Sequence, residues 1–72
     1  MTELVWTQEQ LNATTWKLCV DAGPEIHIET EISIPETALA MVPDDQRERF
    51  ITANLRPARL EMEEEAQRRL AA

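Results

Sequence analysis

The segment from Glu25 to Ile34 alternates strictly between two classes of side chain, and this pattern constrains the fold more than any other. Isoleucine or threonine stands at each even position, while glutamate, histidine or serine stands at each odd position. Successive side chains of a strand point to opposite faces of a sheet, so a period of two over ten residues predicts a β-strand with one buried face.

A second alternating segment, Thr14 to Val20, precedes the first and predicts an antiparallel hairpin. The residues between them include Gly23, the only glycine of the chain, which suits a turn that needs a left-handed backbone. The two apolar faces must coincide, since a slip of one residue would reverse one of them. With the turn centred on Gly23, the expected pairs are Val20–Ile26, Leu18–Ile28, Trp16–Thr30 and, on the polar face, Lys17–Glu29.

The first thirteen residues fit two different local structures. A short strand or extended arm through Trp6, followed by a turn near Asn12, would extend the hairpin into a three-stranded meander. The sequence from Thr7 to Gln10 also matches a capping box that opens one helical turn. We favour the strand.

The composition changes at Pro35 from β-branched residues to good helix formers. Pro35 suits the start of a helical segment that leads to Val42, and Pro43 suits the start of the next. Pro57 lacks a backbone donor and would clash with the preceding turn, so we expect this second helix to kink or restart there. The sequence predicts one small α+β domain over residues 1–72, β-rich over about 3–34 and followed by proline-punctuated helices over 35–71.

The predicted helix is longer than the strands of the predicted hairpin, so the hairpin alone cannot cover its apolar face. Ten strand residues span roughly 33 Å, whereas a helix over residues 43–71 would span about 43 Å, and a lone hairpin is marginal in water. Either the helix folds back at Pro57 or a second subunit covers the surplus apolar surface. We expect a homodimer or larger oligomer, with the following candidate interface residues: Trp6, Phe50, Ile51, Leu55, Met62 and Leu70.

The charge balance excludes several classes of partner. Fourteen acidic residues against seven basic ones leave a net charge of −7. Direct nucleic-acid binding needs a basic surface, and an anionic membrane would repel this chain. No segment has the length and apolarity of a membrane span or a signal peptide, and the single free cysteine fits a reducing cytoplasm. A basic protein is the permitted partner, for which the candidate acidic patch is Glu61, Glu63, Glu64 and Glu65.

Few residues are candidates for catalysis or metal binding. Cys19 and His27 face each other in the expected register. A structural zinc site needs four ligands and this pair supplies two, although a two-fold axis could supply four. Ser33, the only serine, lies about 20 Å from His27 along the same strand, too far for a dyad. Glycine-rich phosphate loops and paired-cysteine motifs are absent from the sequence. We therefore expect no catalytic residue, no metal site and no cofactor.

These observations favour a small acidic interaction protein that self-associates, is not an enzyme and binds a host protein, of the kind that bacteriophages encode among their accessory genes. It would then act in the host cytoplasm. One alternative is a mimic of nucleic-acid charge, which requires carboxylates spaced along one face like phosphates. Another is an antitoxin-like or assembly-chaperone-like inhibitor of a basic partner, whose C-terminal helix would be disordered in the free protein.

Overall fold

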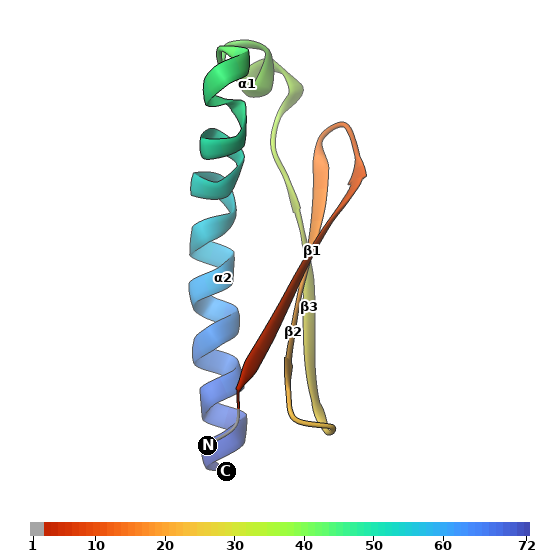
Figure 1. The fold of residues 1–72 in the computed structure, drawn as a ribbon, viewed down its shortest axis with the longest axis vertical. Coiled ribbons are helices and arrows are strands. Elements are labelled where there is room, and N and C mark those ends of the chain that lie inside the picture. The colour runs from red at the N-terminus through yellow and green to blue at the C-terminus, as the bar shows by residue number, and fades with distance from the viewer. Residues whose placement is uncertain (1–2) are drawn as a thin grey trace.

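The computed structural model describes residues 3–72 as a three-stranded antiparallel sheet with one long helix beside it (Figure 1). The sheet order is β1-β2-β3, so β2 is the central strand. The predicted α+β class and the meander are confirmed, but one long helix dominates the C-terminal half. The elements are β1 (Leu4–Asn12), β2 (Thr15–Ala22), β3 (Ile26–Ser33), α1 (Glu36–Ala40), the 3-10 turn η1 (Asp44–Gln46) and α2 (Arg47–Ala71).

The predicted hairpin is formed by β2 and β3, but the predicted register is wrong by two residues. The observed pairs are Trp16–Ile32, Lys17–Glu31, Leu18–Thr30, Cys19–Glu29 and Val20–Ile28. Pairing continues to Ala22 and Ile26, so the loop contains only residues 23–25, with Gly23 at a φ of 78°. A shift of two residues keeps every side chain on its predicted face, and alternation therefore could not separate the two registers.

The N-terminal segment is a strand that pairs with β2 over most of its length. Thr7 lies opposite Cys19, so the alternative helical turn is not formed. A side-chain cap stabilises a helix by about 1 kcal/mol, less than the backbone pairing and side-chain packing that the strand gains. The predicted turn near Asn12 is confirmed, since the Asn12 Oδ1 accepts a hydrogen bond of 2.9 Å from the Thr14 backbone N–H.

The three prolines of the C-terminal half occupy two kinds of position. Pro35 and Pro43 stand directly before α1 and η1, where the missing backbone donor has no helical partner to lose. Pro57 lies inside α2, which continues through it, so the predicted restart is not observed and the helix does not fold back. The chain thereby forgoes one helical hydrogen bond in the interior of α2.

The core lies between α2 and the sheet, mainly against β2 and β3. Its buried residues are Trp16, Leu18, Val20, Ile34, Leu39, Leu55 and Met62, each at most 5% exposed. Within residues 3–72, no polar or charged residue is buried. One helix against a three-stranded sheet makes an elongated molecule of 43 × 18 × 15 Å.

Candidate functional site

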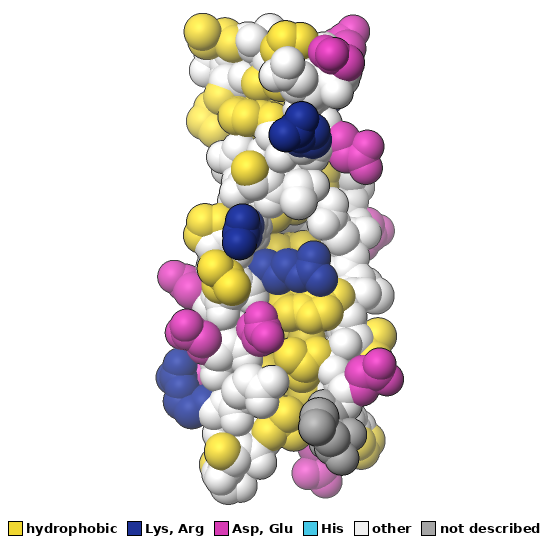
Figure 2. Space-filling model, turned by 60° about the vertical axis from the view of Figure 1, so that its left-hand side comes forward, with side chains coloured by type: hydrophobic (Ala, Val, Ile, Leu, Met, Phe, Trp, Pro, Cys, Tyr) yellow, Lys and Arg dark blue, Asp and Glu magenta, His cyan; other side chains and the backbone are white. Residues whose placement is uncertain are grey.

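A groove separates α2 from β1, because the helix packs mainly on β2 and β3 and leaves the first strand partly uncovered. Figure 2 shows apolar side chains along this opening, with a basic side chain lying across it. The groove has a volume of about 950 Å³ and is open to solvent along its length. Its shape suits an elongated protein surface better than a buried small molecule.

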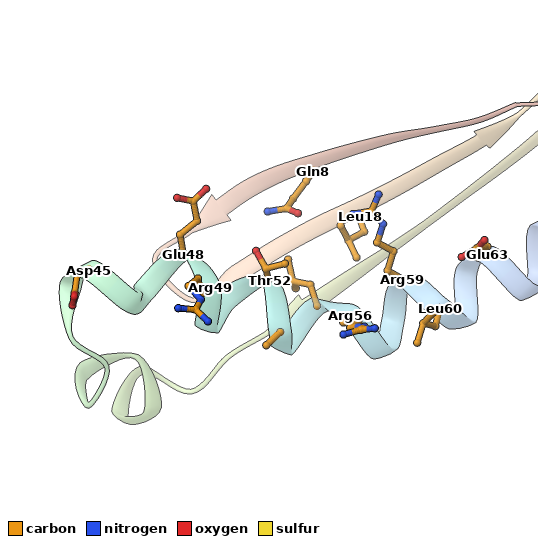
Figure 3. Close-up of a pocket in the computed structure, with 12 residues that line it drawn as sticks. Gln8, Leu18, Asp45, Glu48, Arg49, Thr52, Arg56, Arg59, Leu60 and Glu63 are labelled. Atoms are coloured by element: carbon orange, nitrogen blue, oxygen red, sulfur yellow. The ribbon is translucent and has the colours of Figure 1, made fainter.

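Charged side chains of α2 line the groove beside an apolar floor (Figure 3). Leu18 and Leu55, which are both buried, contribute to the floor, and Gln8 projects from β1. Three arginines and three acidic residues also line it: Arg49, Arg56, Arg59, Asp45, Glu48 and Glu63. The groove is therefore nearly neutral on a chain of net charge −7, and its occupant need not be basic.

Trp6 lies close to this groove and is partly covered by a neighbouring side chain. The Arg59 guanidinium carbon lies 4.6 Å from the centroid of the Trp6 ring, which is the geometry of a cation–π contact. Trp6 is half-buried and packs against the core. The candidate interface tryptophan thus joins α2 to β1 within one chain.

The other candidate interface residues divide into two groups. Leu55 and Met62 are 3% and 5% exposed, so the sheet of their own chain covers them. Phe50, Ile51 and Leu70 are half-buried. These three and Trp6 are the members of the predicted set that retain surface for a partner.

Sequence reasoning missed Leu60, which is 51% exposed and lines the groove. The buried residues of α2 share one face of the helix: Leu55, Met62 and Ala66. Leu60 lies off that face, so the helical spacing of apolar residues that predicts a buried face does not include it. The charges that flank Leu60 could nevertheless have identified it as a candidate interface residue. Leu60 is an apolar residue between Arg56 and Glu64, each four positions away on the same helix.

The four residues of the candidate acidic patch differ in exposure and in ion pairing. Glu65 is half-buried and forms ion pairs with Arg68 at 3.0 Å and with Arg69 at 3.1 Å. Its charge is therefore balanced locally. Glu61, Glu63 and Glu64 remain exposed on α2.

The opposite face of the sheet brings together Cys19, His27 and Glu29. Because of the observed register, Cys19 stands opposite Glu29, and His27 stands opposite Asp21. Glu29 Oε2 lies 3.2 Å from His27 Nε2, 3.3 Å from Lys17 Nζ and 3.7 Å from Cys19 Sγ. The predicted Lys17–Glu29 pair thus exists as a diagonal contact, while the two residues are not directly opposite.

These contacts favour the charged forms of three groups. Hydrogen bonds to Asp21 and then to Glu29 raise the pKa of His27. Hydrogen bonds from His27 and then from Lys17 lower the pKa of Glu29. The same bond to Glu29 raises the pKa of Lys17. His27 and Glu29 are exposed and Lys17 is partly exposed, so water screens the attraction between these groups.

Comparison with protein-family models, with curated proteins and with solved structures finds no match to this chain. Over the residues that the structure describes, no helix combines the length and apolarity needed to span a membrane.

Proposed function

We propose that this chain is a small non-enzymatic interaction protein that acts as a homodimer, in which the α2 helices of two copies lie antiparallel along the groove. The observation that supports this most directly is the charge arrangement about Leu60. Arg56 lies four residues before Leu60 and Glu64 four residues after it. Residues four apart share one face of a helix, so basic, apolar and acidic side chains follow one another along α2.

This order makes the exposed surface of α2 complementary to itself. In a two-fold interface every contact occurs twice: if residue i of one copy contacts residue j of the other, then residue j of the first copy contacts residue i of the second. Two antiparallel helices that cross at Leu60 place Arg56 of each copy opposite Glu64 of the other. Two pairs of opposite charge then flank a pair of leucines. A parallel arrangement would instead oppose like charges, so the pattern favours the antiparallel one.

The groove gives the second helix apolar surface and room. Leu60 lies at its edge, and Thr52 and Ala53, whose side chains are small, line the groove on the same helix. Small side chains allow close approach between helices. Burial of Leu60 supplies affinity, whereas the charge pairs mainly set orientation and the rate of encounter.

The net charge of −7 favours a basic host protein as the target of this dimer. The charge-mimic alternative receives less support, because Lys17 and His27 stand among the carboxylates of the sheet's polar face. A row of carboxylates spaced like phosphates would lack such interruptions.

Replacing Leu60 by glutamate should abolish self-association at micromolar concentration. The change puts two carboxylates at the proposed axis, and an unpaired buried charge costs several kcal/mol, so we expect the dimer to weaken by at least about 100-fold. Met41→Glu is the matched control, since Met41 is 85% exposed and lies outside the groove. Sedimentation equilibrium measures both dissociation constants. Equal effects of the two variants would place the interface elsewhere.

A charge exchange tests the antiparallel arrangement itself. Arg56→Glu and Glu64→Arg should each weaken the dimer, because each leaves like charges opposed across the axis. The double variant should recover most of the affinity, since it restores both pairs with their signs reversed. A folded wild-type monomer of 8.3 kDa across the micromolar range would contradict the proposal outright.

A further inference from the structure

We infer a Zn²⁺ site on the polar face of the sheet, formed by Cys19 of β2 together with His27 and Glu29 of β3. Side chains alternate along a strand, and Leu18 and Val20 are buried against the helix, so Cys19 points to the opposite face. The site is therefore separate from the α2 groove, and the inference does not depend on the proposed dimer.

Two of the three separations between the ligand atoms match those around a tetrahedral ion. The Cys19 thiol, the His27 ring and the Glu29 carboxylate each offer one atom, all within 4.8 Å of one another. With zinc–ligand distances of about 2.0–2.3 Å, neighbouring nitrogen and oxygen ligands lie about 3.3 Å apart, and sulfur and oxygen about 3.5 Å apart. The observed separations are 3.2 Å for His27 Nε2 to Glu29 Oε2 and 3.7 Å for Cys19 Sγ to Glu29 Oε2. The third, between Cys19 Sγ and the ring nitrogen of His27, is within 4.8 Å.

The sheet holds these residues in place. Cys19 and Glu29 are direct cross-strand partners, and His27 is two residues from Glu29 on the same face. Strand positions of this kind are rigid compared with loops, so little ordering is needed when the ion binds. Asp21 supplies a carboxylate for the second ring nitrogen of His27, a contact that metal-binding histidines commonly make. Its Oδ1 lies 2.5 Å from His27 Nδ1, which orients the ring and leaves Nε2 as the ligand atom.

The donor set favours zinc over the common hard cations. A thiolate and an imidazole suit Zn²⁺, whereas Mg²⁺ and Ca²⁺ prefer oxygen ligands throughout. On binding, Cys19 releases its thiol proton and a charged His27 releases its Nε2 proton, both to solvent, and water takes the fourth position. The Lys17 ammonium group lies 3.3 Å from the Glu29 oxygen and must leave it. Lys17 therefore weakens the site without being part of it.

Isothermal titration of the full chain with Zn²⁺ tests the inference. We expect one ion per chain, and a loss of affinity of at least about 100-fold in Cys19→Ser and in His27→Gln, because each removes a ligand. Asp21→Asn should weaken binding by about 10–100-fold through the orientation of His27. Lys17→Met should strengthen it. Glu31→Gln is the control, since Glu31 is an exposed neighbour on the same strand and face but outside the ligand set.

Titration with Co²⁺ gives an independent readout of the ligands. A cysteine thiolate bound to Co²⁺ produces a charge-transfer absorption band, which we expect in the wild type and not in Cys19→Ser. Circular dichroism establishes that each variant is folded before its affinity is compared. Binding without saturation at one ion, binding that survives His27→Gln, or an equal loss in Glu31→Gln would each overturn the site.

Discussion

Replacing Met62 by alanine should destabilise the protein by about 2–5 kcal/mol, through lost transfer free energy and the cavity left behind. Met62 is 5% exposed and lies in the core with Leu18, Val20 and Leu55. A domain of 72 residues has a total stability of only about 3–5 kcal/mol from such a core. We therefore expect the variant to be largely unfolded at 25 °C. Urea denaturation followed by circular dichroism measures the loss.

Met41→Ala is the matched control for that experiment. Met41 is 85% exposed and follows the last residue of α1, so the same truncation should change stability by no more than about 0.5 kcal/mol. Both variants need the same protein concentration, since self-association adds to the apparent stability. Comparable losses at the two methionines would show that Met62 does not pack against the sheet in solution.

The strands were predictable because their apolar side chains face the helix and their polar side chains face water. In β2 and β3, one face meets the helix and the other meets water, and the alternation of Trp16, Leu18 and Val20 records this directly. The register was not predictable from the same pattern, since a shift by two residues preserves both faces. It depends on the residue about which the turn is centred. Pairing ends at Ala22 and resumes at Ile26, so the loop is centred on Pro24 and not on Gly23.

The continuity of α2 was not predictable from local rules. A proline inside a helix favours a break, yet α2 continues through Pro57. Leu55 and Met62, however, flank Pro57 and pack against the same sheet. A continuous helix keeps both in the core, and this tertiary packing outweighs the local cost at the proline.

The candidate sites were missed for related reasons. In the predicted register Cys19 faced His27 and Glu29 faced Lys17, so only two zinc ligands came together. The observed register brings Glu29 opposite Cys19 and Asp21 opposite His27. Side-chain contacts between β2 and β3 depend on the register of the two strands, and the alternating pattern is compatible with more than one register. Leu60 was missed because it belongs to the exposed side of α2, where periodicity carries no information about the core.

Replacing Pro57 by alanine should stabilise the protein by about 1–3 kcal/mol, because alanine is about 3 kcal/mol more favourable than proline in a helix interior. The new backbone N–H can donate to the carbonyl of residue 53, and the steric clash of the proline ring with that carbonyl disappears. Pro57 is exposed, so its removal leaves no cavity in the core. In a domain of this size the midpoint of thermal unfolding should rise by about 4–8 °C per kcal/mol.

Pro43→Ala is the control, and its effect should have the opposite sign. Pro43 precedes η1, and its carbonyl accepts the 2.9 Å hydrogen bond from the Gln46 N–H whichever side chain is present. Alanine restores no helical hydrogen bond there. It raises the conformational entropy of the unfolded chain, so the free energy of unfolding should fall by about 0.4–1 kcal/mol. Thermal unfolding of the two variants therefore distinguishes two effects of proline on stability: destabilisation inside a helix, at Pro57, and stabilisation directly before a helical turn, at Pro43. A destabilising Pro57→Ala would mean that α2 is interrupted at Pro57 in solution, and that the core residues on its two sides are held by separate helices.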